Sequence, residues 1–152
     1  MKRLIGVLLI LIMVFSYSAA LAQRAESPDG GFSVNLPDHF VEEPVNGYSD
    51  LCFYWHGKKL KVQGYASYQG EVAGSDLFQV LTGEETDYGT KVINGMEMMY
   101  ARTEDDSTVC ITYTWMDRGN CVTLEFNYSA SDESVQNTVN SIINSIRFDA
   151  GH

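Results

Sequence analysis

The chain is short of several residue types, and each shortage narrows its chemistry. Among 152 residues it has three cysteines, three prolines and 10 lysines and arginines, against 20 aspartates and glutamates. It has no phosphate-binding loop, no zinc-protease helix motif and no nucleophile elbow. The signatures that commonly identify nucleotide-binding proteins and hydrolases are therefore missing, and no catalytic residue can be assigned.

Only one long apolar run occurs, and it lies at the N-terminus. Lys2 and Arg3 precede the apolar residues 4–15, and Ala20-Leu21-Ala22 follows as a small-x-small cleavage pattern. A membrane-spanning helix needs about 20 apolar residues, so this run is too short for an anchor. We therefore predict a signal peptide over residues 1–22 and an exported protein, periplasmic or extracellular. No cysteine follows the cleavage site, so lipid attachment there is not expected.

Removing residues 1–22 from 152 leaves 130, a length typical of one domain that buries its own core. The 20 acidic residues remain with 8 of the 10 basic ones, so the mature net charge is −12. Such a charge repels nucleic-acid phosphates and anionic lipid, so we expect no nucleic acid partner and no stable membrane insertion after cleavage. We expect a flexible lead-in over 23–31, one domain over 32–148 and a tail over 149–152.

Alternating apolar and polar residues predict the first strands. Phe32–Leu36 alternates and is followed by a mostly polar loop over residues 38–50. Residues 51–56 and 59–63 alternate on either side of Gly57-Lys58, which predicts a hairpin with a two-residue type II′ turn. That register places Trp55 opposite Leu60 and Phe53 opposite Val62, so one face of the hairpin is apolar.

A second hairpin opens a longer meander. Asn94-Gly95 is the preferred pair for a type I′ turn, and three more alternating strands follow it up to Tyr128. One face of this meander is predicted to be apolar and to carry Met98, Tyr100, Ile111, Tyr113, Trp115, Val122, Leu124 and Phe126. Such a pattern is typical of an antiparallel sheet that is buried on one side.

Two helices are predicted to accompany the sheet. Ser75 can cap a short helix over residues 76–82, and Ser131 or Asp132 can cap a longer one near the C-terminus. The longer helix has an apolar stripe at helical spacing, formed by Val135, Val139, Ile142, Ile143 and Ile146. This amphipathic C-terminal helix should pack on the apolar face of the sheet. The fold class is therefore α+β, an antiparallel β-sheet flanked by helices.

The order of these elements and three phrases within it resemble the PsbP-like superfamily, which also holds Mog-type Ran-binding proteins and DcrB-like bacterial envelope proteins. The phrases are Phe32-Ser-Val-Asn-Leu-Pro37, Val92-Ile-Asn-Gly95 and Ser141-Ile-Ile-Asn-Ser-Ile-Arg-Phe148, and the likeness spans residues 32–148. The resemblance implies an α-β-α sandwich and a non-enzymatic adaptor or assembly role. It carries no catalytic residue over to this chain. The sequence lacks the lipid-attachment cysteine common in bacterial members.

The three cysteines are predicted on the face opposite the aromatic residues. Cys121 lies opposite Met116 in the meander, so Cys110 is about 20 Å away along the hairpin. A disulfide needs Cα atoms within about 7 Å, which excludes a Cys110–Cys121 bridge. We expect an intrachain bridge, if one forms in the exported protein, to join Cys52 to Cys110 or to Cys121. A site with three thiolate ligands is disfavoured because no Cys-x-x-Cys pair occurs, and no metal or cofactor is expected.

One group of residues on the predicted polar face combines aromatic and basic character. These five residues are Tyr48, Tyr54, Lys59, Lys61 and Tyr65. Aromatic residues are favoured at protein contacts, so we interpret the group as a contact surface on an otherwise acidic protein. The alternative is that the helix over 76–82 covers it, because a sheet face needs a cover.

Three functions remain open at this point. The leading hypothesis is a non-enzymatic binding or assembly module of the bacterial envelope that contacts other envelope proteins. The second is a small-molecule- or metal-binding domain that uses the face with Tyr54 and the cysteines. The third is a thiol enzyme or hydrolase. It is weakest because Cys52 and His56 lie about 13 Å apart on one strand, too far for a nucleophile and its base.

Overall fold

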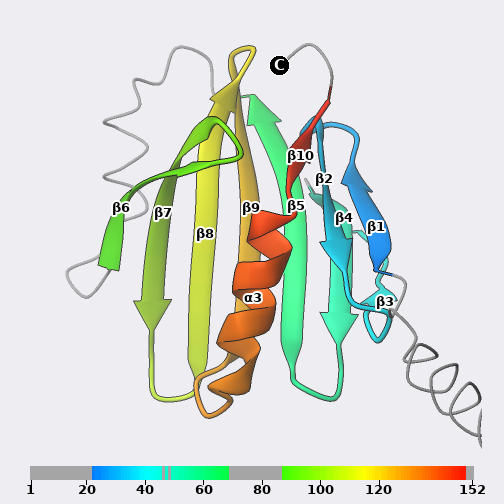
Figure 1. Ribbon diagram of the computed structural model, residues 1–152, viewed down its shortest axis with the longest axis vertical. Coiled ribbons are helices and arrows are strands. Elements are labelled where there is room, and N and C mark those ends of the chain that lie inside the picture. The colour runs from blue at the N-terminus through cyan, green and yellow to red at the C-terminus, as the bar shows by residue number, and fades with distance from the viewer. Residues whose placement is uncertain (1–21, 46, 48, 69–86, 150–152) are drawn as a thin grey trace, which may run out of the picture.

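The computed structural model describes residues 22–45, 47, 49–68 and 87–149, which form two antiparallel sheets and a C-terminal helix (Figure 1). The larger sheet has the strand order β3-β4-β5-β9-β8-β7-β6. Its strands are β3 (Val41–Glu42), β4 (Ser49–Trp55), β5 (Leu60–Tyr68), β6 (Asp87–Ile93), β7 (Met96–Glu104), β8 (Thr108–Asp117) and β9 (Asn120–Ser129). The smaller sheet has the order β1-β2-β10 and consists of β1 (Gln23–Ser27), β2 (Phe32–Leu36) and β10 (Arg147–Phe148).

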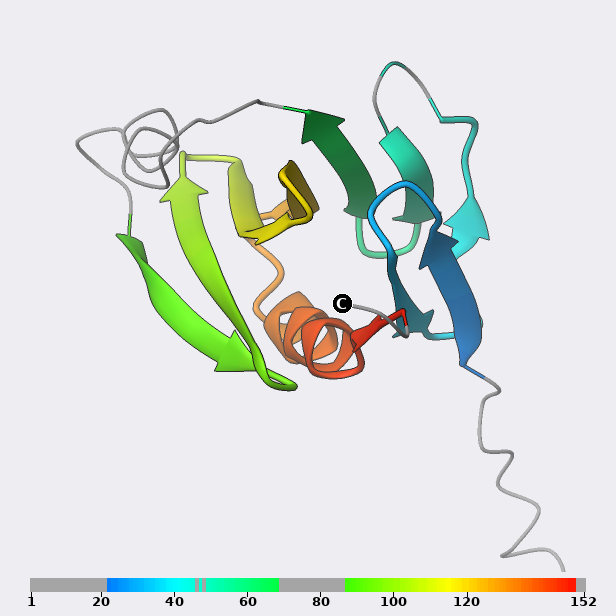
Figure 2. The same cartoon turned by 90° about the horizontal axis from the view of Figure 1, so that it is seen from above.

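The helix α3 (Ser134–Asn144) and the smaller sheet lie side by side on one face of the larger sheet (Figure 2). The predicted apolar stripe of α3 is buried throughout, and it faces a core that includes the predicted apolar residues of the meander. Val135, Val139 and Ile142 are fully buried, as are Leu124 and Phe126 of β9. The α+β class and the position of the C-terminal helix are thus confirmed. The predicted helix over 76–82 lies outside the described residues.

The first hairpin has the predicted register but a different turn. Trp55 pairs with Leu60 and Phe53 pairs with Val62, as alternation required. The turn is a four-residue loop, in which the Lys58 amide donates to the Trp55 carbonyl at 3.1 Å. Lys59, not Gly57, takes the left-handed conformation, with φ of 50°. The prediction of a two-residue type II′ turn was therefore wrong. Such a turn needs a positive φ at Gly57, and in this loop the positive φ is at Lys59 instead.

The predicted flexible lead-in over residues 23–31 is also corrected by the structure. Gln23–Ser27 forms strand β1, which pairs antiparallel with β2 from Gln23 opposite Leu36 to Ser27 opposite Phe32. Ala25 and Ser27 point inward and are buried, whereas Gln23, Arg24 and Glu26 are exposed. The inward side chains are small, so the segment buries little apolar surface and its polar composition hid the strand. The polar loop predicted over 38–50 likewise contains β3 and the start of β4.

The meander follows the prediction closely. Asn94 and Gly95 have φ of 50° and 88°, as a type I′ turn requires. Arg118 and Gly119, between β8 and β9, also have positive φ, at 47° and 81°. Both turns therefore match the right-handed twist of the strands that they connect.

The C-terminal segment is fixed to the rest of the domain by polar as well as apolar contacts. The Asn94 side-chain amide donates to the carbonyls of Asn144 at 3.1 Å and Ile146 at 2.8 Å. After the helix the chain runs extended as β10, which pairs with β2. The predicted cap is different. Glu133 occupies the N-cap position without a side-chain hydrogen bond, and Asp132 instead accepts a hydrogen bond from the Ser134 hydroxyl.

Among the residues that the structure describes, none belongs to a helix that is both long and apolar enough to cross a membrane.

Candidate functional site

The face of the larger sheet that points away from α3 carries a row of side chains from neighbouring strands. Because side chains alternate along a strand, register partners share a face. Val41 of β3 pairs with Tyr54, Tyr54 pairs with Lys61, and Lys61 pairs with Asn127 of β9. The row continues to Cys110 of β8, which pairs with Asn127. An apolar, an aromatic, a cationic and an amide side chain thus stand in sequence across the sheet.

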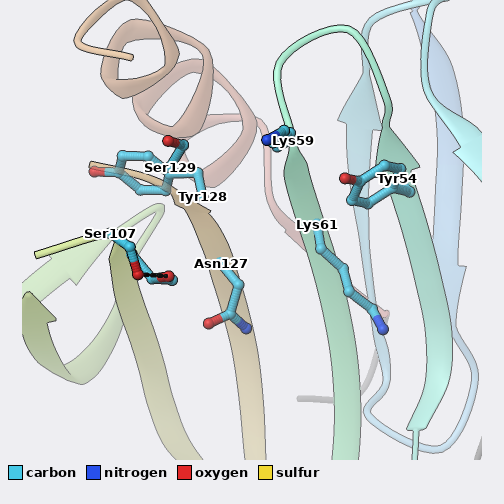
Figure 3. A pocket seen from close by; sticks show the side chains of 8 residues that line it. Tyr54, Lys59, Lys61, Ser107, Asn127, Tyr128 and Ser129 are labelled. Atoms are coloured by element: carbon cyan, nitrogen blue, oxygen red, sulfur yellow. Dashed lines mark hydrogen bonds between the residues drawn. The ribbon is translucent and has the colours of Figure 1, made fainter. Parts of the chain in front are cut away.

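A pocket of about 410 Å³ opens beside this row (Figure 3). It will be called the Tyr54–Lys61 pocket, and its lining residues are Tyr54, Lys59, Lys61, Ser107, Thr108, Asn127, Tyr128 and Ser129. Nearer the opposite end of the sheet the same face is closed, since Thr114, Thr123 and Cys121 are all buried. The accessible part of the face is therefore the end near the β4–β5 loop.

The electrostatic character of the pocket is opposite to that of the whole chain. Among the described residues its lining has two lysines and no aspartate or glutamate, although acidic residues outnumber basic ones by 20 to 10 in the chain. Lys61 Nζ lies 3.8 Å from Glu43 Oε2, a long contact between two partly exposed groups. Exposed pairs of this kind are worth little, about 0.2–1 kcal/mol, so Glu43 only partly offsets the lysine charge.

The β4–β5 loop holds its lysines in different ways. Lys58 Nζ lies 3.2 Å from Asp132 Oδ2 and 3.0 Å from the Ser134 hydroxyl, so it joins the loop to the start of α3. Lys59 lines the pocket, and within the described residues no carboxylate forms an ion pair with it. Lys59 is therefore the cation best placed to receive a ligand.

The turn between β7 and β8 supplies the hydroxyl groups on the far side of the pocket. Asp105 Oδ1 accepts hydrogen bonds from the amides of Ser107 at 2.8 Å and Thr108 at 2.7 Å. These hydrogen bonds, together with one from the Ser107 hydroxyl, lower the pKa of the Asp105 carboxyl. The Ser107 and Thr108 hydroxyls lie 3.3 Å apart at the pocket rim. Figure 3 shows the Ser107 side chain there.

The pocket floor is held by contacts to β9 and α3. The Asn127 side-chain amide donates to Glu125 on the same strand, which orients the amide over the sheet. The Tyr128 hydroxyl donates to Gln136 Oε1 at 2.6 Å, so its ring is fixed towards the helix. The Asn127 amide is thus positioned at the pocket before any ligand arrives, whereas the Tyr128 hydroxyl lies on the face that packs on α3.

The structure brings together three of the five residues predicted as a contact surface, namely Tyr54, Lys59 and Lys61. Tyr65 is on the same face but four residues beyond Lys61 on β5, about 13 Å away. Burial raises the pKa of the Tyr65 hydroxyl, with a smaller contribution from Glu125. Tyr48 lies outside the described residues.

The cysteines do not form the expected bridge, because all three are free thiols. Cys52 on β4 pairs with Gln63 of β5, whereas Cys121 on β9 pairs with Ser67, four residues further along β5. This offset along the strand and the spacing of two strands together place the Cα atoms of Cys52 and Cys121 about 16 Å apart. Cys110 is three strands from Cys52 and two residues out of register with it, about 16 Å away. Both separations exceed the limit of about 7 Å for a disulfide. The separation of Cys110 from Cys121 is as predicted, since Cys121 pairs with Met116 and Cys110 with Asn127.

Burial also affects the reactivity of these thiols. It raises the pKa of Cys110 to about 11, and the nearby Glu125 carboxylate adds to this effect. Burial raises the pKa of Cys52 and of Cys121 as well. Within the described ranges, no group of three or more His, Cys, Asp or Glu side chains could hold a metal ion.

Sequence reasoning missed the half of the pocket that β8 and β9 supply. Ser107, Thr108, Asn127 and Ser129 carry no motif, and they meet Lys61 only because β5 pairs with β9. More than 50 residues separate these two strands in the chain, so local alternation could not reveal the pairing. A contact between two rings was missed too, in which the ring centroids of His39 and Trp55 lie 3.8 Å apart and the rings are tilted by 43°.

By sequence, the chain matches no protein-family model and no curated protein. By structure, it is similar to cyanobacterial PsbP (CyanoP) from Synechocystis sp. PCC 6803, with a TM-score of 0.64, 10% identity, and coverage of 88% of this chain and 95% of that one. It is similar to a Bacteroides thetaiotaomicron protein with a TM-score of 0.62 and 13% identity, covering 86% of this chain and 50% of that one.

The Ran-binding protein Mog1p of Saccharomyces cerevisiae is also similar, with a TM-score of 0.56, 8% identity, and coverage of 86% of this chain and 96% of that one. At these identities the likeness concerns the fold alone. The chain therefore has the PsbP/Mog-like fold, as the resemblance in its sequence implied.

Proposed function

We propose that this chain is an exported, non-enzymatic protein-binding module that contacts its partner in the cell envelope through the Tyr54–Lys61 pocket. The observation that carries the proposal is an accessible pocket with a tyrosine and two lysines on a strongly acidic chain. A protein of the same fold is named as Ran-binding, which is a precedent for protein binding by this architecture.

The composition of the pocket and its rim supports a protein partner. Aromatic residues are enriched at the centres of protein interfaces, and polar residues form the rims. Tyr54 lies between Lys61 and the exposed Val41, whose side chain is available for apolar contact. Hydroxyl and amide groups of Ser107 and Asn127 complete the opposite side (Figure 3). A partner can thus combine burial of Tyr54 with polar contacts around it.

The state of the thiols supports a non-enzymatic role. The thiolate is the nucleophilic and metal-binding form of cysteine. Because burial raises the pKa of Cys110 to about 11, this thiol is protonated at neutral pH. Cys52 and Cys121 are buried and shifted in the same direction. A thiol enzyme would need the opposite shift.

The position of β1 supports export with cleavage after Ala22. The strand begins at Gln23, directly after the predicted cleavage site, and its buried residue Ala25 contributes to the core. Cleavage there leaves every β1–β2 pair intact. A site a few residues further on would remove part of the smaller sheet.

A small molecule is the second candidate ligand, because the volume of the pocket falls within the usual range for ligand sites, about 300–1,000 Å³. Such sites are mostly apolar and enclose their ligand. The Tyr54–Lys61 pocket is open to solvent rather than enclosed, which favours the protein partner.

Photo-crosslinking in the producing cells tests this function. A photoreactive phenylalanine analogue replaces Tyr54 in one variant and Val92 in a control, where Val92 is exposed on β6 at the far edge of the same sheet. We expect a covalent adduct with one defined envelope protein from position 54 and none from position 92. The proposal is wrong if position 54 gives no protein adduct, or if both positions give the same one.

A further inference from the structure

We propose that the Tyr54–Lys61 pocket recognises an acidic segment of its protein partner by binding side-chain carboxylates on Lys59 and Lys61. This inference rests on the proposed function and specifies the chemistry of the partner. It follows from the charge, donor groups and surroundings of the pocket.

The charge of the pocket selects an anion. Lys59 and Lys61 both line it, and among the described residues no acidic one does. Three nearby carboxylates lie outside that lining, namely Glu43 beside Lys61, Glu125 beside Asn127 and Asp105 beside Ser107. They weaken the positive potential without reversing it at Lys59. A carboxylate in the pocket therefore meets one unpaired and one loosely paired ammonium group.

The neutral groups of the lining also suit an anion. Hydroxyls and side-chain amides can donate hydrogen bonds to a carboxylate. Asn127 retains donor capacity because its side-chain NH₂ has two hydrogens and Glu125 accepts from that group. The Thr108 hydroxyl can rotate its hydrogen towards a bound oxygen, whereas the Ser107 hydroxyl already donates to Asp105 Oδ1. Hydrogen bonds with an ionised acceptor are about twice as strong as neutral ones.

The surroundings favour a peptide over a free phosphate or a lipid headgroup. Phosphate sites commonly use arginine forks, helix N-termini or runs of backbone amides, and the lining contains no arginine and no helical residue. An anionic bilayer would face the acidic remainder of the molecule as well as the pocket, which is unfavourable. A short acidic segment places its charge in the pocket alone, and Tyr54 and Val41 offer apolar contact to its neighbouring side chains.

Binding of a model peptide tests this chemistry with the exported protein labelled with ¹⁵N. The probes are hexaglutamate, hexaglutamine as a neutral peptide, and inorganic phosphate. We expect hexaglutamate to shift the side-chain amide signal of Asn127 and the backbone signals of Lys59 and Lys61, and hexaglutamine to shift none of them. Raising the salt concentration should weaken the effect, because the Debye length is only about 10 Å at 0.1 M.

Two double variants with the same loss of charge complete the test. Lys59→Gln/Lys61→Gln should weaken hexaglutamate binding by about tenfold, as expected for the loss of two exposed ion pairs. Arg24→Gln/Arg118→Gln should leave it within about twofold, since both arginines lie outside the pocket and their side chains are more than half exposed.

Each other result overturns the inference. Shifts with phosphate but not with hexaglutamate would show a small-anion site. Equal weakening in both double variants would show a response to net charge, and the absence of shifts would show that the pocket binds no anion. If the photo-crosslink at position 54 still captures a protein in any of these cases, protein binding stands and only acidic recognition fails. If that crosslink is absent while hexaglutamate binds, the proposed function fails and the anion site stands.

Discussion

Gly64→Ala should destabilise the protein, although replacing glycine by alanine in a strand usually stabilises. Gly64 lies on the core side of β5, opposite Leu51 and Leu124. A Cβ atom at this position would stand 2.9 Å from Phe32 Cζ and 3.2 Å from Leu51 Cβ. The Phe32 ring cannot move away freely, because it is buried and packs edge-to-face on Trp115 at 5.1 Å. Gly64 therefore makes room for the smaller sheet to dock.

The expected size follows from two opposing terms. Overpacking a core costs about 1–3 kcal/mol, and the lower entropy of the unfolded chain returns about 0.4–1 kcal/mol. The free energy of unfolding should fall by about 1–2 kcal/mol, which lowers the urea midpoint by about 0.5–1 M at a typical slope. Gly57→Ala is the matched control, since its Cβ would meet only the Trp55 indole nitrogen at 3.4 Å, and it should be neutral or slightly stabilising.

Equilibrium urea unfolding of both variants checks this reasoning, and a double variant identifies the cause. Phe32→Leu removes the ring tip that the new Cβ would meet, so Gly64→Ala should cost less in that background than in the wild type. Two results would refute the close approach of β2 to β5. One is a Gly64→Ala variant as stable as the wild type, and the other is a double variant in which the two losses of unfolding free energy simply add.

Three further predictions concern the helix, the turn that holds it and a thiol. Ile142→Ala should lower the free energy of unfolding by about 2–5 kcal/mol, against less than about 0.5 kcal/mol for the exposed Asn140→Ala, as measured by urea unfolding. Asn94→Ala should cost about 2 kcal/mol by losing two hydrogen bonds to the end of α3 and a favoured left-handed residue, and Asn94→Gly should cost less because it keeps the turn. For Cys110, alkylation of the native protein should be slow at neutral pH and accelerate towards the pKa of about 11, as followed by peptide mapping. Its raised pKa contributes stability below pH 9, the ordinary value for an unfolded thiol, and this contribution should be lost as the pH rises to 11.

Local patterns in the sequence were sufficient to predict the structure where the paired residues are close along the chain. Alternation fixed the register of Trp55 with Leu60, and Asn94-Gly95 fixed the next turn, because each depends on a few neighbouring residues. The apolar stripe ending at Ile146 also predicted the C-terminal helix correctly, since one apolar face at helical spacing has few other interpretations.

Features that depend on distant segments or on small residues could not be predicted from the sequence. Strand β1 was missed because its inward residues are Ala25 and Ser27, which give almost no apolar signal. The pairing of β5 with β9, which completes the Tyr54–Lys61 pocket, joins segments far apart in the sequence. The lack of information on distant strand pairing also explains why a disulfide was wrongly expected. Without the order of the strands, the distance from Cys52 to the other two cysteines could not be judged.

Native mass spectrometry of the wild type and of Tyr54→Ala tests the central claim most directly. Both exported proteins are purified from their own envelope fraction without reduction. The account predicts a wild-type chain that begins at Gln23, shows no mass loss from a disulfide, and carries one protein partner that Tyr54→Ala loses. A partner retained in full by Tyr54→Ala, or a bound small molecule in place of a protein, would contradict it.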